Sequence, residues 1–115
     1  MDERVSKALE FSNFLETQNN QKRIYFSQYN EDLIYYINGN KITVTQQLIS
    51  FCQSLMALNQ TESWLIDDNN IPFIVTDIEQ FTYDVLNVYA NASAKYGKAY
   101  DTIKKSRSVE GLLDL

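Results

Sequence analysis

The chain contains no histidine, one cysteine and three glycines among its 115 residues, and each shortage removes a class of chemistry. Without histidine there is no Ser-His-Asp or Cys-His pair and no imidazole ligand for a metal ion. Cys52 is alone and cannot form an internal disulfide, and the apolar run around it, from Leu48 to Leu58, favours a buried thiol over a reactive one. A glycine-rich phosphate loop is also missing. We therefore expect no catalytic residue, cofactor or metal site, with serine–lysine and paired-carboxylate mechanisms open in principle.

Long apolar runs are missing as well. No segment approaches the run of about 18 apolar residues that reads as a membrane span. Residues 1–4 carry mixed charge with no apolar run behind them, which argues against a signal peptide. The net charge of −5 argues against nucleic acid as a partner. Basic residues nevertheless gather near the end, where they suit a helix C-terminus or, alternatively, an acidic partner or phosphate. They are Lys95, Lys98, Lys104, Lys105 and Arg107.

What the chain does have is an ordinary globular composition rich in aromatic side chains. Its 115 residues are expected to form one domain, 1–115, and 44% hydrophobic with 22% charged residues suits a buried core. It has eight Tyr, six Phe and one Trp. Tyrosine combines apolar area with one polar end, which suits half-buried sheets and contacts between proteins.

The first 29 residues are predicted to form a helix. The apolar positions that share one face are Ala8, Phe11, Leu15, Tyr25 and Tyr29. Residues 16–23, in contrast, are polar all round. A helix of this kind extends past its own core or packs on another chain. The alternative is two shorter helices with a break near Asn19-Asn20.

Residues 30–76 are predicted to hold two β-hairpins around a central core helix. In the first hairpin, Asn38-Gly39 supplies the positive-φ residues of a type I′ turn. Folding about this turn places Tyr35 opposite Ile42 and Leu33 opposite Val44, which makes one face apolar and sets the register. Phe26, Tyr29, Tyr35 and Tyr36 also offer a base-stacking surface in principle, but we favour sheet packing or a protein interface.

The central helix and the second hairpin follow. Thr45 is the expected N-cap of the helix, whose apolar positions between residues 48 and 58 leave little polar surface. The segment Asp67–Asn70 is predicted to be a turn rather than a calcium loop, because it lacks the ligand spacing and the glycine of such loops. Folding about that turn pairs Trp64 with Phe73 as core residues.

The last helix is predicted to span residues 77–105, with a loose tail over 106–115. Thr76 with Glu79 has the spacing of a capping box. Apolar residues then recur every three or four positions. They are Ile78, Phe81, Val85, Val88, Tyr89, Ala92, Tyr96, Ala99 and Ile103.

This helix is longer than a small domain can cover, which predicts an interface with a second copy. Its length is roughly 40 Å, whereas a domain of this size has a radius of gyration of about 13 Å. Gly97 costs the helix on the order of 1 kcal/mol against Ala, which hints at close approach by another backbone. The interface candidates are Ala92, Tyr96, Tyr100 and Ile103.

Three segments resemble small proteins of tailed bacteriophages. The acidic, Asn-rich turn over residues 67–72 and the ending Lys104 to Leu113 resemble phage proteins that join a hairpin to a long helix, and the ending also resembles tail-fibre and baseplate accessory proteins. The opening, residues 8–14, is similar to structural proteins of contractile-tailed phages, prohead core components included. Such families have no active site, so the resemblance implies no functional residues.

The expected fold is therefore α+β, with three helices and two hairpins in the order α-ββ-α-ββ-α. We expect a non-enzymatic bacteriophage structural or assembly protein that acts through contacts with itself and with other phage structural proteins. The resemblance implies a place in the virion or the host cytoplasm. The alternative is a small phage-encoded binding protein that inhibits or redirects a host factor.

Overall fold

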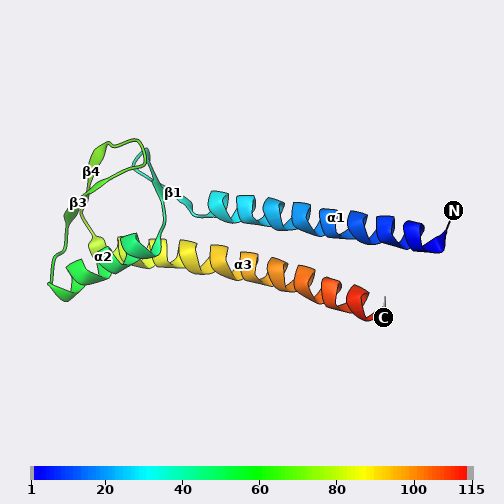
Figure 1. Cartoon of the computed structure of the whole chain (residues 1–115). Helices are drawn as coiled ribbons and strands as arrows, with labels where there is room; N and C mark the ends of the chain where they lie inside the picture. Colours follow the sequence, from blue (N-terminus) through cyan, green and yellow to red (C-terminus); the bar gives the residue numbers. More distant parts are fainter. Residues whose placement is uncertain (1, 114–115) are drawn as a thin grey trace. The chain divides into compact units, whose positions relative to one another are not determined.

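The computed structural model describes the backbone of residues 2–113 and the side chains of residues 2–106. The fold over this range is α+β, which confirms the predicted order α-ββ-α-ββ-α. The elements are α1 (Glu3–Asp32), β1 (Ile34–Ile37), β2 (Asn40–Thr43), α2 (Gln46–Ala57), β3 (Ser63–Ile66), β4 (Pro72–Val75) and α3 (Ile78–Leu113) (Figure 1).

The chain divides into two compact units. Unit 1 consists of the described parts of Met1–Gln28 and Lys95–Leu115, and unit 2 is Tyr29–Ala94. Helices α1 and α3 each contribute to both units. One domain over residues 1–115 therefore stays a prediction.

Both long helices are continuous. Helix α1 runs unbroken through Asn19-Asn20, so the alternative of two shorter helices is wrong. Helix α3 continues to Leu113, which corrects the predicted end at residue 105 and the loose tail over residues 106–113. The reason is composition: this stretch has no proline, and its single glycine, Gly111, comes two residues before the helix ends. Residues 114 and 115 of the predicted tail lie outside the described residues.

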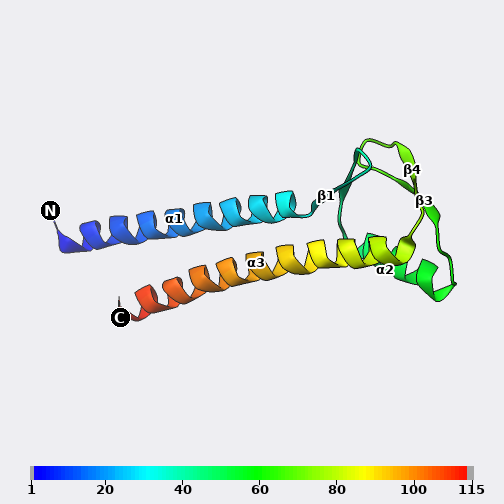
Figure 2. The ribbon, with the colours of Figure 1, turned by 180° about the vertical axis from the view of Figure 1, so that it is seen from behind.

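In unit 1 the two helix segments run antiparallel, side by side (Figures 1 and 2). The buried Gln18 side chain donates from Nε2 to the carbonyl oxygen of Ile103 at 3.1 Å. About two turns away, the Phe26 and Tyr96 rings lie 5.9 Å apart. The polar middle of α1 is therefore not wholly exposed to solvent, since Gln18 is buried there. Its hydrogen bond to Ile103 satisfies the buried side-chain amide.

In unit 2 a hydrophobic core joins both hairpins to α2 and to the first turns of α3. The largest fully buried side chains are Val44, Cys52, Ile78 and Val85, which come from three different parts of the chain. Gln46 Nε2 donates to Tyr89 Oη at 2.8 Å and ties the start of α2 to α3. Helix α2 buries a narrower face than predicted: its residues Phe51 and Met56 are exposed, as is Leu58 directly after the helix.

The first hairpin matches the prediction. Asn38 and Gly39 have φ angles of 50° and 81°, as a type I′ turn requires. Tyr35 pairs with Ile42, and Val44 N donates to the Leu33 carbonyl at 2.8 Å in the same register. Thr45 then caps α2 by accepting from the backbone N–H of Leu48.

The second hairpin has a register one residue away from the predicted one. Trp64 pairs with Ile74 and Leu65 with Phe73, so the predicted Trp64–Phe73 core pair is wrong. The loop has five residues, 67–71, because the buried Asp67 carboxylate accepts from the backbone N–H groups of Asn69 at 2.8 Å and Ile71 at 2.9 Å. An odd loop length moves every side chain of one strand to the opposite face.

Helix α3 begins one residue later than predicted. Asp77, rather than Thr76, is the cap: its Oδ1 accepts from Gln80 N at 3.1 Å, and its carbonyl accepts from Phe81 N. A carboxylate is favoured at this position because it also meets the positive end of the helix dipole. The predicted apolar stripe of α3 is confirmed, since each of its nine residues is buried or partly buried.

Asp68 joins the two hairpins. Its backbone N–H donates to the Lys41 carbonyl at 2.9 Å, and its carboxylate accepts from Thr43 N at 3.0 Å and from Thr43 Oγ1 at 2.6 Å. The Lys41 carbonyl and the Thr43 N–H thus lie on the edge of β2 that is not paired with β1. The loop of the second hairpin thus covers an edge that would otherwise be open to pairing.

Candidate functional site

The second hairpin is apolar on both of its faces. Leu65 and Phe73 point into the core, where they are 8% and 7% exposed. On the opposite side, Trp64 and Ile66 are 66% and 69% exposed, and their partners across the ladder are Ile74 and Pro72. We call the side chains of Trp64, Ile66, Pro72 and Ile74 the outer face. An outward cluster that includes the only tryptophan of the chain is typical of a surface that another protein covers.

Pro72 lies where a proline costs the hairpin nothing. Asp67 N donates to the Ile71 carbonyl at 2.9 Å, so the next pair along, Ile66 with Pro72, is of the non-hydrogen-bonded type. The missing N–H would have pointed outward, away from β3. Proline at this position also discourages edge-to-edge pairing of β4. The exposed apolar surface of this hairpin is therefore its outer face, whereas the free edge of β4 is poorly suited to pairing with an added strand.

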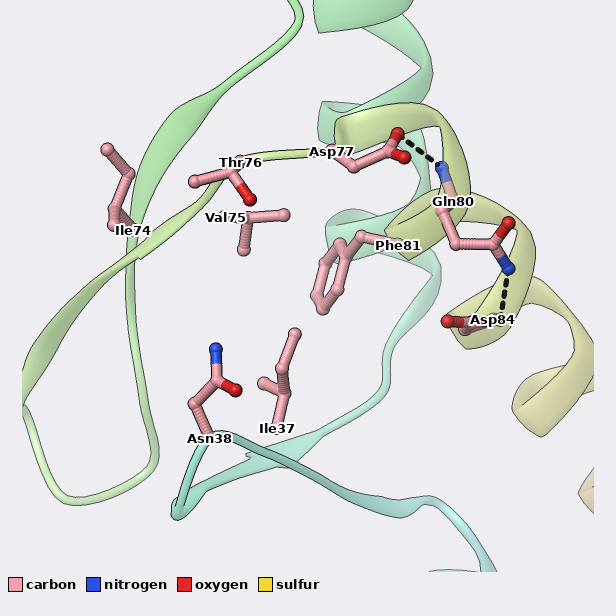
Figure 3. Close-up of a pocket in the computed structure, with 9 residues that line it drawn as sticks. All are labelled: Ile37, Asn38, Ile74, Val75, Thr76, Asp77, Gln80, Phe81 and Asp84. Carbon is pink, nitrogen blue, oxygen red and sulfur yellow. Dashed lines mark hydrogen bonds between the residues drawn. The ribbon is translucent and has the colours of Figure 1, made fainter.

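A groove of about 260 Å³ opens beside Ile74, between the turn of the first hairpin, the end of β4 and the start of α3. Figure 3 shows Ile37, Val75 and Phe81 turned toward one another at its base, whereas the Ile74 side chain points away from them. The helix side of the groove carries Asp77, Gln80 and Asp84. The groove therefore combines an apolar base with two carboxylates on one wall.

Neutral groups hold the carboxylate of Asp84 in place. Gln80 Nε2 donates to its Oδ1 at 2.9 Å (Figure 3), and Tyr35 Oη donates to its Oδ2 at 3.3 Å. Burial raises the pKa of Tyr35 above its ordinary value of 10.0, and the charge of Asp84 and this hydrogen bond raise it further. Tyr35 is therefore a neutral donor at physiological pH and leaves the negative charge of Asp84 uncompensated.

Formal charge is unevenly divided between the units. Unit 2 contains eight Asp and Glu residues and a single basic residue, Lys41, which gives it a net charge of −7. Unit 1 contains nine basic and seven acidic residues. The whole-chain charge of −5 therefore hides one strongly acidic unit.

The predicted interface residues lie in different settings. Ala92, in unit 2, is buried. In unit 1, Ile103 is buried beside Gln18, and Tyr96 is partly buried against Phe26. Tyr100 is more exposed, with the Lys22 ammonium 5.4 Å from its ring centroid and the Tyr96 ring in a T-shaped contact at 6.2 Å. The described part of the chain therefore already covers Ala92 and Ile103. These are two of the four predicted interface residues, which are Ala92, Tyr96, Tyr100 and Ile103.

Cys52 is buried, as predicted, and burial raises the pKa of its thiol, while a hydrogen bond with Thr82 acts in the opposite direction. Across the described residues, no cluster of His, Cys, Asp or Glu has the arrangement to hold a metal ion. None of the helices described has the length and apolar character to cross a membrane.

Sequence reasoning missed the outer face because it assigned Trp64 to the core. The signal that would have found it is the run Asp67 to Asn70. An aspartate can accept from the N–H two residues on, and asparagine tolerates the left-handed region. Asn70 has a φ of 62°. Both features indicate a loop longer than a tight four-residue turn, and hence the observed register.

Comparisons with protein-family models, with curated proteins and with solved structures gave no match to this chain.

Proposed function

We propose that this chain is a non-enzymatic structural or assembly protein that works by binding another protein through the outer face of the second hairpin. The observation that carries the proposal is the exposure of Trp64 and Ile66 on a hairpin whose other face already forms the core. A two-stranded hairpin needs only one apolar face to pack on its own domain. The second apolar face therefore has a use outside the chain.

Burial of this face supplies a driving force for association. Removal of apolar surface from water stabilises a complex by about 25 cal/mol per Å². Trp64 adds a large, rigid ring to the face, and tryptophan is among the residues enriched at the energetic centres of interfaces. Hydrogen bonds to Asp67 already hold the loop that joins the two strands of this face, residues 67–71. Little conformational entropy is therefore lost from this loop when a partner binds.

The phage setting is part of the same proposal, and the resemblance of residues 8–14, 67–72 and 104–113 to small phage proteins supports it. In that setting the partners are other phage structural proteins and further copies of this chain. Contact between copies is best placed on Val5 and Leu9, two exposed apolar residues four positions apart on one face of α1, because Ala92 and Ile103 are already buried.

Incorporation into phage particles tests the proposal. The chain and two variants, Ile66→Ser and Leu58→Ser, are produced during infection, and purified particles are analysed by quantitative mass spectrometry. Ile66 and Leu58 are 69% and 71% exposed, so the two substitutions remove similar exposed apolar area, but only Ile66 belongs to the outer face. We expect the parent chain and Leu58→Ser in the particles and a loss of Ile66→Ser. Equal incorporation of both variants, or absence of the parent chain, contradicts the proposal.

A further inference from the structure

We propose that the segment bound by unit 2 is cationic, with apolar side chains that cover the outer face and a lysine or arginine side chain that enters the groove beside Asp77 and Asp84. This inference rests on the proposed function, because it names the chemistry of the partner at the same site. It commits to a segment of another protein rather than to a nucleic acid, a lipid surface or a second copy.

Charge is the first reason. Unit 2 carries a net charge of −7 with Lys41 as its single basic residue. A field of that sign attracts cationic segments and repels phosphate backbones and anionic headgroups. Complementary charge speeds association and selects the partner. An apolar surface on so acidic a unit therefore favours a partner that is both apolar and basic.

The second reason is where carboxylates lie relative to the outer face. Ile74 contributes its side chain to that face, and the same residue borders the groove that contains Asp77 and Asp84. A segment that covers Ile74 needs to extend only past the edge of β4 to reach them. The groove volume of about 260 Å³ is several times the roughly 30 Å³ of one water molecule, so it has room for the end of a long side chain.

The third reason is the bonding of those carboxylates. Asp84 accepts from Tyr35 Oη and Gln80 Nε2, which orient both of its oxygens without neutralising them. Asp77 accepts from the backbone N–H of Gln80. A guanidinium or ammonium against an oriented carboxylate forms a charge-assisted hydrogen bond, which is stronger than a neutral one. The base formed by Ile37, Val75 and Phe81 suits the methylene stem of the same side chain (Figure 3).

Three synthetic peptides with one shared apolar pattern test the inference. Their polar positions are all Lys, all Gln or all Glu, and binding to the full chain is followed by the fluorescence of Trp64, the only tryptophan. We expect the Lys peptide to bind roughly five- to tenfold more tightly than the Gln peptide, and the Glu peptide to bind most weakly. The preference for Lys should shrink between about 0.15 M and about 1 M salt, because screening weakens the charge contacts.

Two matched variants locate the charge contact. Asp84→Asn removes a carboxylate from the groove, whereas Glu31→Gln removes the same charge from an exposed position of unit 2 outside it. We expect Asp84→Asn to lose most of the preference for Lys over Gln, and Glu31→Gln to keep it. An equal effect of both variants overturns the groove assignment and leaves only general charge attraction.

The outcomes separate this inference from the proposed function. If the Lys and Gln peptides bind equally and Ile66→Ser weakens both, the outer face is a binding surface but the cationic partner is wrong. If no peptide changes Trp64 fluorescence, the inference is overturned, and the particle experiment decides the proposed function separately. If light scattering without peptide shows association that Ile66→Ser abolishes, the occupant is a second copy, which also overturns the inference.

Discussion

Gly97 shows how local geometry decides the effect of a single residue. It lies inside α3, and a Cβ added there would meet nothing within 4 Å. The expectation from the sequence that another backbone approaches Gly97 closely therefore has no support among the described residues. Gly97→Ala should therefore stabilise the chain by about 1 kcal/mol, because alanine loses less backbone entropy in a helix. Urea unfolding measures the change. A destabilised variant would indicate a second chain against this position.

Tyr35 predicts a specific response to alkaline pH. Burial, the charge of Asp84 and the hydrogen bond between them raise its pKa in the folded chain above the ordinary 10.0. The folded state therefore holds this proton more tightly than the unfolded state, and the resulting stabilisation is complete below the unfolded pKa and is lost as pH rises through the folded one.

Tyr35→Phe isolates this contribution from the other seven tyrosines. We expect the parent chain to lose stability more steeply than Tyr35→Phe above about pH 10, and the two to have parallel pH profiles below it. Urea unfolding across this range provides the comparison. Parallel profiles at all pH values would show that Asp84 and burial do not act on Tyr35.

At the scale of elements, the two hairpins show what sequence could and could not predict. Asn38-Gly39 forms a two-residue turn that requires positive φ at both positions, and few residue pairs meet that requirement. The sequence therefore predicted the turn type, the register of β1 with β2 and the buried face of this hairpin. The loop at 67–71 depends instead on a side chain, since Asp67 replaces a ladder acceptor for Ile71 N. Apolar residues on both strand faces gave no pattern that could correct the error.

The loop of the second hairpin should depend strongly on Asp67. Asp67→Ala leaves the N–H groups of Asn69 and Ile71 without their acceptor, and we expect a loss of about 2 kcal/mol in unfolding free energy. Asn69→Ala is the control, because it changes an exposed side chain in the same loop and removes no acceptor of these bonds. Denaturant melts that give the two variants equal stability would show that Asp67 does not set the loop.

At the scale of the whole molecule, periodicity and turn residues predicted the order of helices and strands. They did not predict how the chain divides into two units. Long-range contacts such as Gln18 with Ile103 cannot be read from a polar stretch, because burial of an amide depends on an acceptor 85 positions away. The acidity of unit 2 is present in the sequence, but it becomes visible only once the structure shows which residues belong together.

The central claim is that the outer face is open in the isolated chain, ready for a partner. Acrylamide quenching of Trp64 fluorescence tests it directly, because the chain has no other tryptophan. With Trp64 66% exposed, we expect quenching in the folded chain nearly as efficient as in the chain unfolded by denaturant. A strongly shielded tryptophan that stays shielded on dilution would place Trp64 inside the chain and contradict the observed register, the outer face and the function built on it.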